Sequence, residues 1–236
     1  MDEKINPREK LWRKIRNRDM VDILNSAAEL HGHYCPGLSL GVNAGVTAIS
    51  EKGLKHEGME DVLAVVETNN CFSDGIQYTT GCSFGNNSLI FRDFGKTAFT
   101  LTDRSGEGIR ITVRKDAGKN WEDEFPEYKK LFEKVVEERN ENEEAERRFM
   151  EVGKKVSKYI VEVDPDKIFN IEKVKIDLPN YAPIHESKIC SKCSESVMET
   201  RTVEKDDKIF CLECGEADYY ELTGFGMKLK KRNLDE

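Results

Sequence analysis

The sequence predicts an α+β fold, in which helices pack on an antiparallel-rich sheet, followed by a small four-cysteine module. Helical periodicity fills the first fifty residues and returns after residue 121, and a group of apolar, β-branched runs lies between these helical regions. Strands that come as a group, not in regular alternation with helices, indicate α+β architecture. Two Cys-x-x-Cys pairs near the end predict the separate module. A chain of 236 residues has room for one core and such a module.

The first predicted helices lead to a segment that contains two histidines. Apolar residues recur at helical spacing as far as Leu30, with a break near Asp19. Gly32 favours helix termination. We therefore expect His31 and His33 to lie at the C-terminal end of a helix.

A turn and a second helix follow. Cys35-Pro36-Gly37 predicts the turn, and a helix is expected over residues 38–52. Gly41 and Gly45, four residues apart, would let another backbone pack closely against this helix. Cys35 would precede the helix N-terminus, a position that lowers the pKa of a thiol.

The middle of the chain predicts four strands. Residues 62–68 are apolar and β-branched, which is typical of a buried strand. Further strands are expected over residues 89–91, 97–102 and 109–113, with glycines marking the turns. Such turns favour antiparallel pairing.

Residues 121–160 predict one or two amphipathic helices. The segment is acidic, and aromatic and aliphatic residues recur at spacings near three and four. Asn140 and Asn142 interrupt this stripe midway. The stripe either packs on the chain's own core or joins two chains in a homodimer, and the pattern does not separate these alternatives.

The chain therefore divides into three parts. Residues 1–160 form the core with its helical extension. Residues 161–186 form a connection that prolines interrupt, with a short strand expected over residues 174–178. Residues 187–236 form the cysteine module and a basic tail.

The module predicts a structural zinc site. Its ligands are two pairs separated by seventeen residues: Cys190, Cys193, Cys211 and Cys214. Four thiolates complete a tetrahedron around zinc and leave no position for water. A hairpin is expected to turn at Asp206-Asp207, and a helix after the second pair would make the module a treble clef. A second knuckle at Gly215 would instead make it a zinc ribbon.

Two short segments of the core gather potential ligands. The candidate catalytic residues are His33, Cys71 and Asp74. The candidate cofactor-binding residues are His31, Cys35, Gln77, Thr80 and Cys82. A thiolate among imidazoles binds a soft or borderline metal or acts as a nucleophile, so a second metal of unknown identity is one expectation. The alternative is a capped helix end with buried, hydrogen-bonded side chains.

Asp74 and Gln77 lie three residues apart, on one face of a helical turn. They would orient a ligand histidine or hold a polar substrate group. For Asp74, helix capping is an alternative role.

These motifs resemble the FmdE family of formylmethanofuran dehydrogenase proteins. The resemblance is carried by residues 31–41, Cys71-x-x-Asp74-Gly-Ile-Gln77, Thr80-Gly-Cys82-x-x-Gly85 and Phe94-Gly-Lys96, and it covers roughly residues 15–115. The C-terminal cysteine pairs match as well, and the resemblance implies a treble clef. Where the family has Gly-Lys-Gly-Asn, this chain has Gly85-Asn86-Asn87-Ser88, so the role of that lysine is not carried over.

Composition narrows the functional classes. The net charge is −8 and 35% of residues are charged, which argues against a general nucleic-acid binder. The short basic tail at Lys228, Lys230, Lys231 and Arg232 does not change this expectation. The sequence contains no apolar stretch of membrane-spanning length and no secretory signal at its start, so we expect a cytoplasmic protein whose cysteines bind metal.

Two functional classes remain. The resemblance implies a connection with molybdenum- or tungsten-dependent formylmethanofuran dehydrogenase, an oxidoreductase that reduces carbon dioxide onto methanofuran in methanogenesis. The other class is a metal- or cofactor-handling accessory protein whose zinc module holds a protein partner. A vacant coordination position in the core favours chemistry, and a closed site favours structure or delivery.

Overall fold

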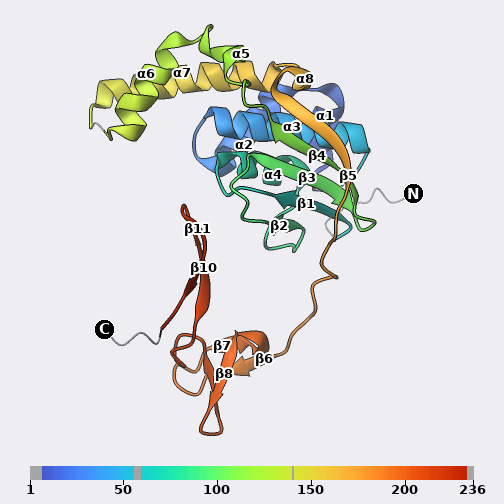
Figure 1. The fold of residues 1–236 in the computed structure, drawn as a ribbon, viewed down its shortest axis with the longest axis vertical. Helices are drawn as coiled ribbons and strands as arrows, with labels where there is room; N and C mark the ends of the chain where they lie inside the picture. Colours follow the sequence, from blue (N-terminus) through green and yellow to red (C-terminus); the bar gives the residue numbers. More distant parts are fainter. Residues whose placement is uncertain (1–6, 56–59, 140, 233–236) are drawn as a thin grey trace. The chain divides into compact units, whose positions relative to one another are not determined.

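The computed structural model describes residues 7–55, 60–139 and 141–232. It divides into two compact units, residues 1–179 and 180–236. The first unit contains, in chain order, α1 Glu9–Asn17, α2 Met20–His31, α3 Pro36–Lys52, β1 Val62–Val66, α4 Cys71–Thr80, β2 Leu89–Phe91, β3 Ala98–Asp103, β4 Glu107–Val113, α5 Lys119–Glu122, α6 Pro126–Phe132, a π-helical turn Glu133–Glu137, α7 Glu143–Glu162, α8 Pro165–Ile168 and β5 Phe169–Lys175 (Figure 1). The predicted α+β class is confirmed.

The core sheet has five strands in the order β2-β1-β3-β4-β5. All neighbours pair antiparallel except β1 and β2, which pair in parallel with Ala64 opposite Leu89. The parallel pair departs from the expected antiparallel pairing, because α4 carries the chain back across the sheet between the two strands.

The two faces of the sheet differ in polarity. One face presents a row of apolar side chains, with Val66 opposite Phe99 and Phe99 opposite Ile111. The other face carries Thr100 beside Arg110, whose guanidinium donates to both carboxylate oxygens of Glu67 at 2.7 and 2.9 Å. Helices α3 and α4 contact the apolar face, so the core lies between these helices and the sheet.

Strand β5 lies within residues 161–186, which we expected to be a connection. It pairs with β4 along its whole length, from Val113 opposite Phe169 to Glu107 opposite Lys175. Because β5 is an edge strand, several of its side chains face solvent, and its sequence lacks the apolar run of a buried strand.

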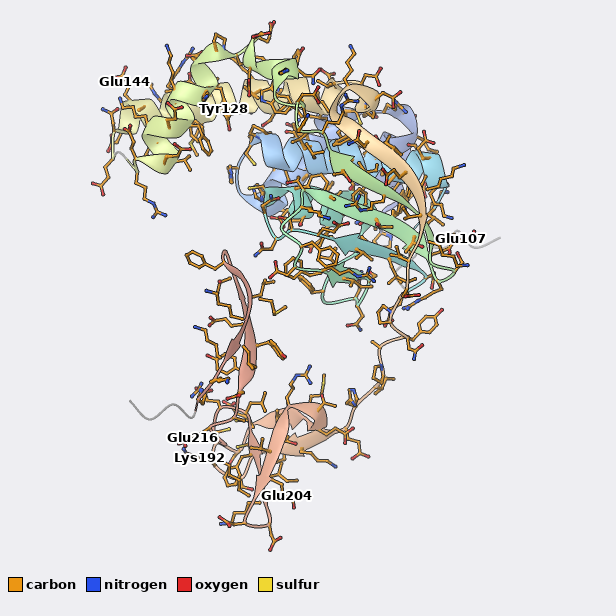
Figure 2. All side chains as sticks on the ribbon, viewed as in Figure 1. Glu107, Tyr128, Glu144, Lys192, Glu204 and Glu216 are labelled. Carbon is orange, nitrogen blue, oxygen red and sulfur yellow. The ribbon has the colours of Figure 1, made fainter. Side chains whose placement is uncertain are left out.

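Helix α7 joins the core and the helical extension. Asn142 caps its N-terminus by accepting from the Ala145 N–H, whereas Asn140 lies outside the described residues. The C-terminal half of α7 packs on α3, where the Asn43 side chain donates to carbonyl oxygens at the end of α7. The N-terminal half packs on α6 through aromatic rings, and Tyr128 stacks on Phe149 with ring centroids 5.6 Å apart (Figure 2).

The second unit consists of short hairpins. Its elements are β6 Ser187–Ile189, β7 Ser196–Met198, a 3-10 turn Glu199–Arg201, β8 Thr202–Lys205, β9 Lys208–Cys211, β10 Tyr219–Thr223 and β11 Gly226–Lys230. The predicted turn at Asp206-Asp207 is confirmed, because both residues have positive φ and join β8 to β9. Residues 212–216 form turns where a treble clef requires a helix, so the second cysteine pair forms a knuckle of the zinc-ribbon kind.

No helix in the described residues is both long and apolar enough to cross a membrane.

Glycines allow α3 and α4 to pack with their backbones in contact. A Cβ added at Gly75 would lie 2.5 Å from the Val42 nitrogen and 2.6 Å from the Leu38 oxygen. Gly41 is equally restricted, because its Cβ would overlap the Phe72 carbonyl. The predicted close approach of a backbone to the 38–52 helix is therefore confirmed.

We expect Gly75→Ala to lower the free energy of unfolding by about 3 kcal/mol in urea denaturation, because backbone atoms leave no room for the methyl group. On an open helix the same change would raise stability by about 1 kcal/mol. The matched control is Gly85→Ala, where an added Cβ meets nothing within 4 Å. A Gly75→Ala protein as stable as the wild type would contradict the packing described here.

Candidate metal centre

The close crossing of α3 and α4 brings their N-terminal ends together. Cys35 is the N-cap of α3, and its sulfur accepts from the Leu38 N–H at 3.4 Å. Cys71 is the first residue of α4, and Asn70 caps that helix. A Cβ at Gly37 would lie only 3.0 Å from the Cys71 Cβ. The two cysteines therefore face one site although 36 residues separate them in the sequence.

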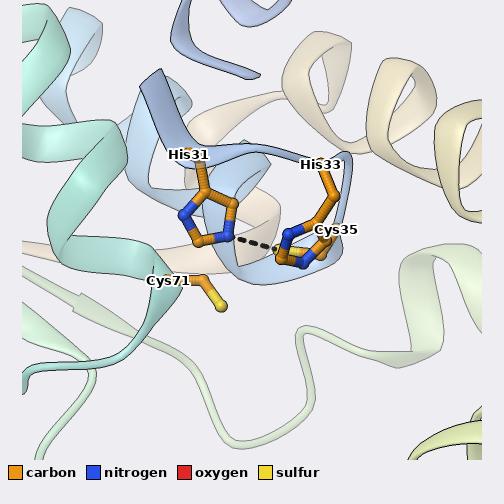
Figure 3. Close-up of side chains that lie close together, drawn as sticks. All are labelled: His31, His33, Cys35 and Cys71. Atoms are coloured by element: carbon orange, nitrogen blue, oxygen red, sulfur yellow. Dashed lines mark hydrogen bonds between the residues drawn. The ribbon is translucent and has the colours of Figure 1, made fainter. Parts of the chain in front are cut away.

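Four potential ligands converge at this site (Figure 3). Each of the following offers one ligand atom, and these atoms all lie within 4.8 Å of one another: His31, His33, Cys35 and Cys71. The His31 Nε2 lies 3.7 Å from the Cys35 sulfur, and the two imidazole rings are 4.4 Å apart between centroids. The end of α2 and the loop after Gly32 place both histidines here, as the sequence predicts.

Asp74 orients one of the histidines. Its Oδ2 lies 2.7 Å from the His31 Nδ1, one helical turn after Cys71. This contact directs the opposite ring nitrogen, Nε2, towards the cysteines. A carboxylate behind a histidine fixes its tautomer and raises its basicity as a ligand. Asp74 thus has the orienting geometry that the sequence predicted as one of its two roles.

The two thiols share one proton unequally. A hydrogen bond from the Cys35 thiol, together with the positive potential of His31, lowers the pKa of Cys71 to about 5. The same hydrogen bond and burial raise the pKa of Cys35. The expectation that the N-cap position lowers the pKa of Cys35 is therefore wrong. The thiolate forms instead on Cys71, which lies at the N-terminus of α4.

This set of side chains fits a borderline transition metal. Two imidazoles and two thiolates are the donors that zinc and similar ions prefer. Ligand atoms around tetrahedral zinc lie about 3.3 to 3.8 Å apart. The ligand atoms in the structure, all within 4.8 Å, need only small side-chain rotations to reach that arrangement.

Three sequence candidates lie outside the cluster. Cys82 is fully buried beyond the C-terminal end of α4, where its sulfur lies 3.5 Å from the Val62 carbonyl oxygen. The Thr80 hydroxyl donates to the Ile76 oxygen of its own helix. Gln77 is half-buried on α4, one turn after Asp74. The structure brings neither Thr80 nor Cys82 to the four ligands.

Two cavities flank the cluster. One has a volume of about 600 Å³, and its lining includes Cys35, Cys71, Trp121, Phe125, Tyr128 and Phe132. We call it the aromatic groove. The other has a volume of about 750 Å³ and borders His33 and Tyr34, with Glu29, Glu146 and Lys154 in its polar wall. Sequence reasoning assigned the aromatic residues of the 121–160 stripe to helix packing only, because periodicity does not show which members border a site.

The second cluster lies in the C-terminal unit. One sulfur from each of Cys190, Cys193, Cys211 and Cys214 lies within 4.8 Å of the others. The Cys193 backbone N–H is the largest of the interactions that lower the pKa of Cys190 to about 6. The Cys214 N–H likewise donates to the Cys211 sulfur at 3.3 Å. Four thiolates surrounded by N–H donors are typical of a closed metal site.

The fold and the two clusters define a metal-binding protein with an α+β core. A sequence model of FmdE, described as "Molybdenum formylmethanofuran dehydrogenase operon", matches residues 30–170, which is more than half of the chain. The chain belongs to the FmdE family.

Two known proteins are similar to this chain. A probable S-adenosyl-L-methionine-binding protein of Archaeoglobus fulgidus is 38% identical over 230 residues, which cover 95% of this chain. The match spans only 58% of that relative's length. A crystal structure of an FmdE-like protein of tungsten formylmethanofuran dehydrogenase, from Syntrophus aciditrophicus, has the same fold, with a TM-score of 0.53 and 24% identity over 83% of this chain and 91% of that one.

We expect Asp74→Asn to weaken zinc binding at the core site about 10- to 100-fold, because the carboxylate that orients His31 is lost. Competition with a chromophoric chelator measures this affinity. The control is Asp22→Asn, an exposed carboxylate on α2 that should leave the affinity unchanged. Equal affinities for Asp74→Asn and wild type would show that Asp74 does not orient a ligand.

Proposed function

We propose that the core cluster binds one transition-metal ion, zinc being the ion that its donors suit best. The observation that carries this proposal is the convergence of two imidazoles and two thiols within 4.8 Å. The carboxylate at 2.7 Å from His31 supports it, because buried histidines that serve only packing need no such partner. A bound metal would supply Lewis acidity beside the aromatic groove.

The chain's own residues have distinct roles in this proposal. His31, Cys35 and Cys71 hold the metal, and Asp74 holds His31. The aromatic groove admits an organic ligand to the sulfur side of the site, and its aromatic walls keep water away. His33 and Cys71 are the groups closest to an incoming substrate and remain our candidates for contact with it.

At the level of its assembly, we propose that the protein works beside a molybdenum- or tungsten-dependent formylmethanofuran dehydrogenase, as an associated component or as a metal-handling accessory protein. The family's description supports the connection. In this role the C-terminal module holds structural zinc and offers a surface to the protein partner.

We further propose a homodimer, formed through the helical extension. The aromatic rings of α6 and α7 satisfy much of the apolar stripe within one chain. Phe132, Val136 and Met150 nevertheless remain exposed. Light scattering at micromolar concentration distinguishes a dimer from a monomer.

Binding of S-adenosyl-L-methionine is a second candidate function. The observation in its favour is the name of the Archaeoglobus relative, which this chain matches at 38% identity. The aromatic groove supports it, because flat purine rings stack on such side chains. Calorimetric titration with S-adenosyl-L-methionine tests it. A titration without heat would assign that binding to the part of the relative that this chain does not match.

Elemental analysis tests the metal sites separately. We expect about two zinc ions per wild-type chain and about one in either Cys71→Ser or Cys190→Ser/Cys193→Ser, because each change removes ligands from one cluster only. The control is Cys82→Ala, a buried cysteine outside both clusters, which should retain both ions. If Cys71→Ser retains both ions, Cys71 is a packing residue and the core proposal is wrong.

A further inference from the structure

The four side chains of the core cluster are not held equally. The His31 side chain is only 9% exposed, and Asp74 fixes its ring. The Leu38 N–H donates to the Cys35 sulfur, and Cys71 packs against Gly37. These three ligands therefore start from α2, α3 and α4 with their directions set by the fold.

His33 lacks such support. It lies in the loop after Gly32, whose φ of 91° ends α2, and it is exposed. Its ring contacts the His31 ring, but among the described residues no hydrogen bond or ion pair orients it. A ligand that is not oriented by its surroundings dissociates more readily than one that is.

The surroundings provide space for the His33 ring to leave. The larger cavity borders His33 directly, and carboxylates of Glu29 and Glu146 lie in its wall. An imidazole that leaves the metal can therefore donate its N–H to a carboxylate there instead of remaining unpaired.

The aromatic groove provides a route for a replacement. It reaches both sulfur ligands, and its wall consists largely of aromatic rings. Those rings are held without a bound molecule, because Tyr128 stacks on Phe149 and Phe125 contacts Tyr159 with centroids 5.6 Å apart. Burial raises the pKa of Tyr128, so its hydroxyl stays protonated and can donate to a ligand.

We propose that His33 is an exchangeable ligand, and that a small Lewis base bearing an aromatic ring replaces it through the aromatic groove. The proposal rests on the proposed function, because it requires a metal in the core. Three fixed ligands and one exchangeable ligand convert a site that is closed at rest into one with an open position. The chemical class of the ligand is thereby set at both ends: a metal-binding nitrogen, oxygen or sulfur at one end and a flat ring at the other.

The test uses full-length protein loaded with Co²⁺, whose visible spectrum reports its ligands. Imidazole and 4-phenylimidazole carry the same metal-binding group and differ by one ring. We expect both to change the spectrum, and 4-phenylimidazole to bind about tenfold more tightly, which is the gain expected from ring stacking and burial. The four-cysteine site is closed, so its spectrum contributes a constant background.

Variants separate the roles of the residues. Trp121→Leu should bring the two affinities close together without weakening imidazole, whereas Trp12→Phe, outside the groove, should keep the tenfold ratio. His33→Ala should retain core cobalt and bind imidazole more tightly, because the competing internal ligand is gone. His31→Ala should lose core cobalt.

Three results would overturn the proposal. The first is a wild-type spectrum that neither ligand changes, and the second is equal affinity for the two ligands in the wild type. The third is loss of core cobalt in His33→Ala as complete as in His31→Ala. The first two, observed with two cobalt ions per chain, would leave the proposed metal site intact. One cobalt per wild-type chain, bound only at the four cysteines, would overturn both proposals.

Discussion

The close contact between the backbones of α3 and α4 is the constraint on which the core site depends. Gly41 and Gly75 make this contact possible, because a side chain at either position would meet backbone atoms of the opposite helix. With the helices this close, Cys35 and Cys71 begin two helices at one point in space. Any separation of the helices would move the two sulfurs apart. The cluster is therefore a consequence of helix packing, and flexible loops contribute only His33.

The site combines rigid and adaptable parts on opposite sides. Asp74 and the helix termini fix three ligands, while the exposed His33 borders a cavity that can receive its ring. The helical extension adds the aromatic groove on the sulfur side. Because α6 reaches the core through α7, residues more than eighty positions after the histidines complete the surroundings of the site. The second unit has the opposite character, since its four thiolates form a closed site.

The sequence was informative where chemistry or backbone geometry depends on residue type. Gly32 and Gly53 ended helices as expected, and the ligand types of residues 31–35 and Cys71 identified the cluster. Sequence reasoning did not separate Cys82 from these ligands, because distance along α4 and burial are properties of the fold. It missed β5 and the lining of the groove for a related reason. Edge strands and aromatic stripes have similar patterns whether they border solvent, core or a ligand.

The central claim is that the core binds a metal through mixed nitrogen and sulfur ligands. X-ray absorption spectroscopy at the zinc edge tests it most directly, on the full-length Cys190→Ser/Cys193→Ser variant in which the other site is disabled. The structure predicts a shell of two nitrogen and two sulfur ligands, at about 2.0 and 2.3 Å. A variant without zinc, or a shell made of oxygen and nitrogen alone, would contradict the claim.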